Sequence, residues 1–92
     1  MTDYDLQLMV YRNGPTFVAI GAAGDFFSYK GGVYRGECAD SINHGVLLYG
    51  WDDESWHMQN SWGEGWGYGG HFYLPRGENK CGVQLEAANV IL

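Results

Sequence analysis

The apolar residues of the chain fall in short runs separated by turn-forming residues, which indicates a protein made mainly of β-strands. The clearest run lies at 44–51 (HGVLLYGW) and has four large apolar residues in a row. We expect this strand to be covered on both faces, because near-continuous apolar runs are typical of such strands. An acidic turn (DDE, 52–54) follows, and 55–60 (SWHMQN) is predicted to return as the second strand of a hairpin.

Other segments have a similar strand-like composition. The expected strands lie at 16–22, 33–35, 44–51, 55–60, 70–74 and 83–92. In the first of them, Val18 and Ile20 fall on the face opposite to Phe17. Residues 26–34 are expected to be irregular, and 61–70 contains too many glycines for regular structure. Because the strands follow one another at hairpin spacing, we expect an antiparallel, barrel-like sheet.

One short helix is predicted at the N-terminus. Thr2 can cap it, with Asp5 three residues further on in an imperfect capping box. Leu6 and Val10 belong to a narrow apolar face, and the sequence Asn-Gly-Pro at 13–15 ends the helix. The predicted fold class is therefore α+β, with one helix and a mainly antiparallel sheet.

Length and charge exclude several classes of protein. A chain of 92 residues allows one small domain (1–92), and its net charge of −6 argues against a nucleic acid or an anionic membrane as partner. No apolar run reaches the roughly 18 residues that a membrane-spanning helix needs. Acidic Asp3 and Asp5 follow Met1, so we expect no signal peptide in this chain.

The two cysteines, Cys38 and Cys81, allow a single pairing. A bond between them would close a loop of about 43 residues and stabilise the fold by roughly 4 kcal/mol from chain entropy. Left unpaired, they would be buried thiols of a protein in a reducing compartment. Composition alone leaves both possibilities open.

A histidine at the head of the apolar strand and an asparagine at the end of the returning strand are features that a core strand does not need. If 44–51 pairs with 55–60, His44 and Asn60 both fall at the open end of the hairpin. The asparagine carbonyl can then accept the imidazole N–H and fix its tautomer. Trp62 could cover this contact and exclude water, which would strengthen the hydrogen bond. A histidine held in this way can act as a general base or as the ion-pair partner of a thiolate.

The residues around this pair resemble those of the papain-like cysteine proteases, which include the cathepsins. NHGV at 43–46 is similar to the family's histidine motif, and QNSWGEGWGYGGHF at 59–72 is similar to its asparagine motif, NSWGxxWGxxG[YF]. Shorter stretches agree as well, namely NGP at 13–15, YKGGVY at 29–34 and CGV at 81–83. The resemblance covers nearly the whole chain and corresponds to the right-hand, β-barrel domain of the family's fold.

This resemblance implies roles for four residues of the motifs. His44 is the catalytic histidine, Asn60 is its orienting partner, and Trp62 is the indole that shields them. Trp66 helps to build the primed side of the cleft. The family's chemistry needs no cofactor and no metal, so none is expected.

A disulfide and a substrate pocket are implied in the same way. Cys38 and Cys81 match a disulfide of this domain. Ala19, Gly45 and Glu86 match positions of the pocket for the second substrate residue before the cleaved bond. The two small residues would leave room, and a carboxylate near the pocket floor would accept Arg or Lys as well as apolar side chains. A solvated surface glutamate is the alternative for Glu86.

The family's nucleophile has no counterpart in this sequence. That cysteine lies in a CG[SA]C[WY] motif on the left-hand domain, and neither Cys38 nor Cys81 lies in such a motif. The oxyanion-hole glutamine is also absent, because Gln59 belongs to the asparagine motif. The chain alone is therefore expected to hydrolyse nothing and to expose apolar surface along the cleft.

The resemblance also implies partners and a compartment. We expect a left-hand domain that supplies the cysteine, peptide or protein substrates, and inhibitors of the cystatin type. The expected disulfide and the family both suggest an endolysosomal, vacuolar or secreted setting for the parent enzyme.

Three other functions are compatible with parts of the sequence. A pseudo-protease half would bind peptides or inhibitors without cutting them. A sugar-binding module would use aromatic and acidic side chains, namely Trp51, Trp56, Trp62, Trp66, Asp52, Asp53 and Glu64. A metal site would use the histidines His44, His57 and His71, but their spacing fits no compact ligand pattern.

Overall fold

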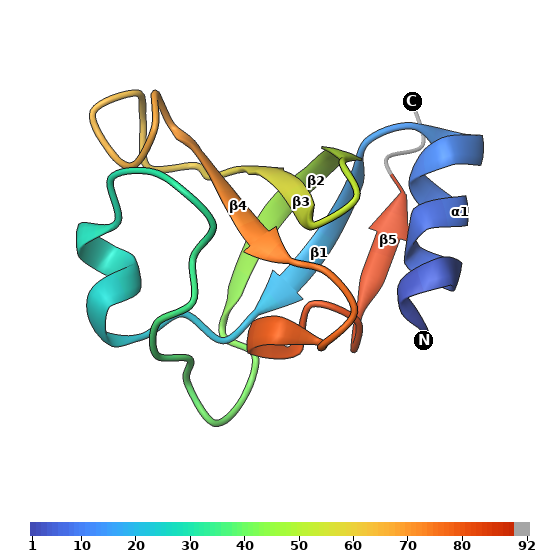
Figure 1. Cartoon of the computed structure of the whole chain (residues 1–92), viewed down its shortest axis with the longest axis horizontal. Coiled ribbons are helices and arrows are strands. Elements are labelled where there is room, and N and C mark those ends of the chain that lie inside the picture. Colours follow the sequence, from blue (N-terminus) through green and yellow to red (C-terminus); the bar gives the residue numbers. More distant parts are fainter. Residues whose placement is uncertain (90–92) are drawn as a thin grey trace.

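The computed structural model describes residues 1–89 of the chain. In chain order the elements are α1 (Asp3–Asn13), β1 (Thr16–Ile20), the 3₁₀ helix η1 (Gly24–Ser28), β2 (His44–Trp51), β3 (Ser55–Gln59), β4 (His71–Pro75), the 3₁₀ helix η2 (Lys80–Gly82) and β5 (Ala87–Asn89). The five strands form one antiparallel sheet in the order β4-β3-β2-β1-β5. Helix α1 lies at one end of the molecule beside β1 and β5, and η1 lies at the other end (Figure 1). The predicted α+β class and antiparallel sheet are confirmed.

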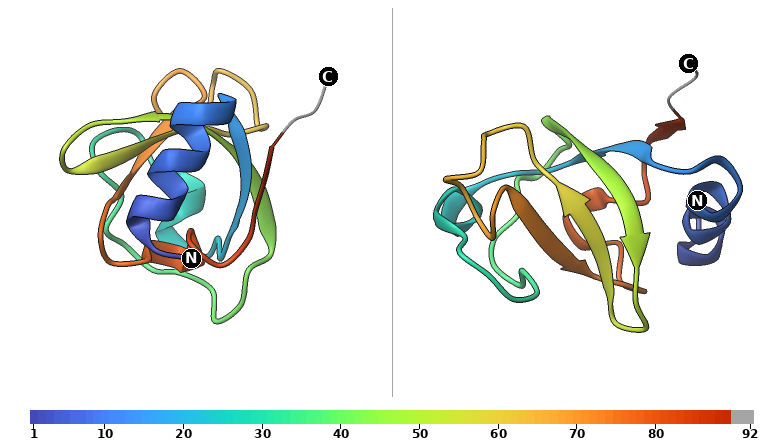
Figure 2. Two further views of the ribbon diagram at one scale, coloured as in Figure 1. Left: turned by 90° about the vertical axis from the view of Figure 1, so that its right-hand side faces the viewer. Right: turned by 90° about the horizontal axis from the view of Figure 1, so that it is seen from above.

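Helix α1 begins and ends where the sequence predicts. The Thr2 hydroxyl accepts the Asp5 N–H at 3.0 Å and the Asp5 carboxylate accepts the Thr2 N–H at 3.0 Å, so the capping box is complete. Gly14, with φ of 81°, ends the helix and donates its N–H to Val10 O. Leu6 and Val10 are buried in the hydrophobic core. Figure 2 shows α1 in front of the strands when the molecule is seen from this end.

The hydrophobic core lies on one face of the sheet. In β1, Val18 and Ile20 are buried whereas Phe17 is 51% exposed, which confirms the predicted alternation. In β2, however, Val46 and Leu48 are buried but Tyr49 is 38% exposed. The prediction that both faces of this strand are covered was therefore wrong, because the core packs against only one of them.

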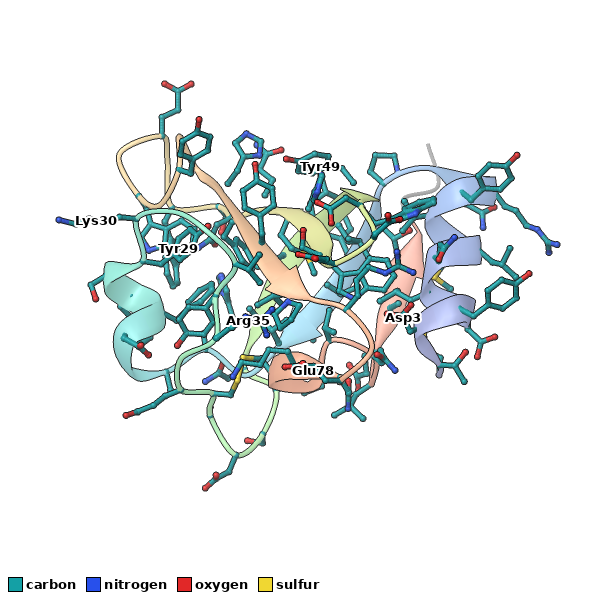
Figure 3. The ribbon with its side chains drawn as sticks, viewed as in Figure 1. Asp3, Tyr29, Lys30, Arg35, Tyr49 and Glu78 are labelled. Carbon is teal, nitrogen blue, oxygen red and sulfur yellow. A yellow bond between two sulfur atoms is a disulfide. The ribbon has the colours of Figure 1, made fainter. Side chains whose placement is uncertain are left out.

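A row of side chains, one from each strand, crosses the opposite face of the sheet. Strand register aligns one residue from each strand, in the order Ala88, Phe17, Leu47, Gln59 and His71. Tyr49 lies on this outer side of the sheet (Figure 3). Its hydroxyl oxygen is 3.0 Å from His71 Nδ1, a hydrogen-bond distance. Phe17, on the same face, is about half exposed.

Several predicted segments differ from the structure in extent. The strand predicted at 16–22 ends at Ile20. Gly24–Ser28 forms η1, so the start of the predicted irregular segment is helical. At 33–35 there is only an isolated bridge, from Val33 to Tyr73, in place of a strand. The predicted strand at 83–92 is limited to Ala87–Asn89 within the described residues, and 90–92 lie outside them.

A disulfide joins Cys38 to Cys81, which confirms that the two cysteines are paired. The bond ties the long segment before β2 to η2. The sheet is connected to the same place, because Gly21 N–H donates to Cys81 O at 2.8 Å and Ala22 forms a bridge with Cys38.

Within the described part of the chain, no helix is long and apolar enough to cross a bilayer.

The acidic turn between β2 and β3 is held together by the Asp52 carboxylate. It accepts the N–H groups of Glu54 and Ser55, both at 2.8 Å, and His57 Nε2 lies 2.8 Å away. The hydrogen bond with His57, followed by those from the backbone, lowers the pKa of Asp52. Arg76 links the turn to α1, since it donates to the Asp52 carbonyl at 2.7 Å and to the Asp3 carboxylate at 2.9 Å.

We predict that Asp52→Asn reduces stability near neutral pH and that the difference from the wild type shrinks in acid. A carboxylate whose pKa is lowered by folding stabilises the protein above its unfolded pKa of about 3.9, and this contribution is lost progressively as the pH falls from that value through the lower pKa of the folded state. Urea unfolding near pH 7 and near pH 3 measures the difference. Asp53→Asn, at the neighbouring exposed carboxylate, is the control. Parallel pH curves for the wild type and Asp52→Asn would contradict the prediction.

Candidate active site

The hairpin brings His44 and Asn60 together at its open end. His44 is the first residue of β2, and Asn60 directly follows β3. Leu47 pairs with Gln59, so one further step along the two strands sets Asn60 opposite Val46, on the same face as His44. His44 Nε2 and Asn60 Oδ1 are 2.8 Å apart. The contact expected from the sequence is thus present in the structure.

The neighbouring backbone determines which hydrogen bond this is. Asn60 Oδ1 also accepts the N–H of Ser61 at 2.8 Å, which orients the carboxamide oxygen toward the imidazole. A carbonyl oxygen only accepts, so Nε2 of His44 carries the proton that it donates. Nδ1 is then the ring nitrogen that can take up or release a proton toward another group. Asn60 is only 5% exposed, so the ring is held by a buried acceptor.

Trp62 covers the pair. Its indole stacks on the His44 imidazole with ring centroids 4.7 Å apart and an angle of 25° between the planes. The indole is itself 39% exposed, so it separates the imidazole from solvent on that side. Exclusion of water lowers the local dielectric and strengthens the hydrogen bond to Asn60.

An aromatic cluster supports Trp62. Trp66 meets it edge-on at 5.3 Å, and the buried Phe26 meets it at 5.8 Å. Phe27 stacks on it at 5.5 Å. The two phenylalanines come from η1, and sequence reasoning missed them because η1 is far from the asparagine motif in the chain. The signal that could have found them is the pair of adjacent phenylalanines in a segment otherwise expected to be irregular.

The glycines between β3 and β4 let the chain fold back tightly beneath these rings. Gly67 has φ of 63°, and a Cβ there would lie 2.9 Å from the His71 carbonyl oxygen and 3.2 Å from the Tyr29 ring. Tyr29 in turn packs against Trp66 at 5.5 Å. Only glycine fits at position 67, because any side chain there would collide with the backbone of His71 and with the Tyr29 ring.

Ala19, Gly45 and Glu86 line one hollow of about 550 Å³ on the side of the sheet that carries Phe17. Gly45 pairs with Ala19, and Ala19 N–H donates to Glu86 O at 3.3 Å. A Cβ at Gly45 would meet nothing within 4 Å, so the absence of a side chain leaves open space here. Glu86 is exposed. The three residues predicted for the substrate pocket therefore lie together, and one of them, Gly45, directly follows His44 in the chain.

The residues that a sugar-binding module or a metal site would need do not lie together in the structure. Trp56 is fully buried beneath Arg76, so the four tryptophans do not share a surface for a sugar. His57 is paired with Asp52 and His71 with Tyr49, whereas His44 is paired with Asn60. Among residues 1–89, no group of three His, Cys, Asp or Glu side chains could hold a metal ion.

Known proteins are similar to this chain in sequence and in fold. Residues 2–91 match a family described as papain family cysteine protease. The chain is 37% identical over 84 residues to a gut-specific cysteine proteinase of Caenorhabditis elegans, with 86% of this chain and 26% of that protein covered. It is 41% identical over 86 residues to cathepsin B-like protease 1 of Arabidopsis thaliana, with 87% of this chain and 23% of that protein covered.

A solved structure agrees with the sequence relatives. Digestive procathepsin L 3 from the larval midgut of Tenebrio molitor superposes with a TM-score of 0.85 and 36% identity, over 98% of this chain and 32% of that chain. The chain thus spans about a quarter of the length of the curated relatives, 26% and 23%, and about a third of the solved chain, 32%.

We predict that Asn60→Ala destabilises the fold by about 1–3 kcal/mol, because it leaves the N–H groups of His44 and Ser61 without their buried acceptor. Asn60→Asp retains an acceptor oxygen and is expected to lose less. Urea unfolding of the two variants measures the difference. Equal stability of Asn60→Ala and the wild type would mean that the contact does not hold the hairpin end in place.

Proposed function

The chain belongs to the papain family of cysteine proteases, and we propose that it is the right-hand domain of a peptidase, supplying the histidine and its orienting asparagine. The observation that carries this proposal is the 2.8 Å contact between His44 Nε2 and Asn60 Oδ1 under the Trp62 indole. A buried hydrogen-bond acceptor and an aromatic cover are what a histidine base needs to keep one tautomer and one orientation.

The proposed reaction is hydrolysis of a peptide bond by a thiolate. With Nε2 committed to Asn60, Nδ1 of His44 faces the thiol and takes its proton, which gives a thiolate–imidazolium pair. The thiolate attacks the carbonyl carbon, and Nδ1 returns the proton to the leaving amine. In the second half of the reaction, Nδ1 takes a proton from water while the resulting hydroxide attacks the thioester. The proton then returns to the sulfur as the acid product leaves.

Two tryptophans have supporting roles in this proposal. Trp62 shields the hydrogen bond between His44 and Asn60. Trp66 contributes to the primed side of the cleft, where the leaving peptide lies. Its contact with Trp62 at 5.3 Å supports this assignment, because both indoles then form one aromatic surface beside the imidazole.

The sulfur is proposed to come from a left-hand domain. Cys38 and Cys81 are joined in a disulfide, so neither offers a thiolate. The half-exposed Phe17 is suited to apolar packing against such a domain. Peptide or protein substrates, cystatin-type inhibitors and an endolysosomal, vacuolar or secreted setting complete the proposal, and the disulfide is consistent with such a setting.

We predict that this chain alone cleaves no peptide and that an irreversible thiol-directed peptidyl probe does not label it. In a protein that joins it to a left-hand domain with the nucleophilic cysteine, His44→Ala should lower kcat/KM by about 10⁴-fold or more. Tyr11→Ala, on the exposed side of α1, is the control and should retain activity. Labelling of this chain alone would contradict the assignment of roles. A two-domain protein that binds peptides but never cuts them would support the pseudo-protease alternative.

We further predict that Glu86→Gln in the two-domain protein reduces the preference for Arg over Leu at the second residue before the cut. The expected change in the ratio of kcat/KM values is about tenfold, the size of one hydrogen bond to a charged group. Glu64→Gln, at a carboxylate outside the hollow, is the matched control. An unchanged ratio would mean that Glu86 is a solvated surface residue.

A further inference from the structure

The 3₁₀ helix η1 presents two adjacent phenylalanines in opposite environments. Phe26 is fully buried, whereas Phe27 is 56% exposed. Phe26 packs into the core against Phe72 at 5.0 Å and Tyr34 at 5.2 Å. Phe27 is therefore a large apolar side chain that lies half in solvent, and its contacts must be found outside the core.

Phe27 lies against the indole that covers the histidine. Its ring stacks on Trp62 with centroids 5.5 Å apart and an angle of 21° between the planes. Trp62 stacks on His44 at 4.7 Å and 25°. Three aromatic rings, Phe27, Trp62 and His44, are therefore stacked in series with nearly parallel neighbours. Trp62 lies between the other two rings of this series.

The backbone of the same residue reinforces this contact. Phe27 O accepts a hydrogen bond from Trp66 Nε1 at 3.1 Å, and Trp66 meets Trp62 at right angles. Both the ring and the carbonyl of Phe27 thus reach into the glycine-rich loop that carries the two tryptophans. Offset-stacked and edge-to-face aromatic pairs are the favoured arrangements of such rings.

The helix that carries Phe27 is itself firmly attached. The Asp25 carboxylate accepts the Tyr34 hydroxyl at 2.7 Å and the Glu37 N–H at 3.0 Å. Phe26 fixes the helix to the core on its inner side. This attachment lies at the end of the molecule marked by Tyr29, far from Asp3 on α1 (Figure 3). η1 is therefore attached to the core through contacts of its own, and this attachment lets it position the loop with Trp62.

We propose that Phe27 is a positioning residue for His44, acting through Trp62. By stacking on the indole, Phe27 keeps it closed over the imidazole and keeps water away from the hydrogen bond between His44 and Asn60. Loss of the Phe27 ring frees the indole to move outward, which opens that hydrogen bond to solvent. The consequence for catalysis rests on the proposed function, but the positioning itself can be measured on this chain without any nucleophile.

The experiment follows the His44 Nε2 proton by ¹H–¹⁵N NMR and measures its rate of exchange with water. Phe27→Ala should raise this rate by about two- to tenfold, the factor that one aromatic pair accounts for. Phe27→Tyr keeps the ring and should retain the wild-type rate. Phe27→Leu keeps a large apolar side chain without a flat ring and should also raise the rate. Tyr11→Ala is the matched control, because it removes an exposed aromatic ring at the α1 end of the molecule.

Each result has a defined meaning. If Phe27→Ala fails to fold, as shown by collapse of the amide spectrum, Phe27→Leu decides the question in its place. Unchanged exchange in the variant that folds, or an equal rise in Tyr11→Ala, would overturn the proposal. A faster exchange in the Phe27 variants combined with an inactive two-domain protein would refute the proposed function and leave this inference standing. Unchanged exchange in the Phe27 variants combined with an active two-domain protein would refute this inference and leave the proposed function standing.

Discussion

The hydrogen bond between His44 and Asn60 depends on how β2 and β3 are joined, because the two residues lie sixteen positions apart and meet only when the hairpin closes. Asp52 closes it by accepting the N–H groups of the turn, and Arg76 ties that turn to α1. The turn at the closed end of the hairpin therefore helps to set the positions of His44 and Asn60 at its open end. The contact between these two side chains thus depends on packing elsewhere in the domain, including that of Arg76 against Asp3 of α1.

Much of this could be predicted from the sequence because the relevant interactions are local or strongly patterned. The cap of α1 needs only Thr2 and Asp5, three residues apart, and the bounds of β2 follow from its apolar run. The meeting of His44 and Asn60 follows from a short turn and an alternation of period two. The pairing of Cys38 with Cys81 was implied by resemblance and is present in the structure.

Other features could not be predicted because they depend on residues that come together only in three dimensions. The support of Trp62 by Phe26 and Phe27 joins segments more than thirty positions apart, and no local pattern relates them. The one-sided burial of β2 also escaped prediction. An apolar run has the same composition whether its second face packs within one chain or is left for another domain, so the exposure of Tyr49 could not be assigned in advance.

The single oxygen that Asn60 offers to both His44 and Ser61 has a consequence for sequence variation in this part of the chain. Because this atom serves the imidazole and the first backbone amide of the loop at once, the loop must leave the strand in one direction whatever its later course. Trp62 directly follows Ser61, so the direction of the chain at this point also sets where the indole lies over the imidazole. An insertion of one residue just before Asn60 would move its carboxamide away from His44 but would keep the hydrogen bond to the neighbouring Ser61.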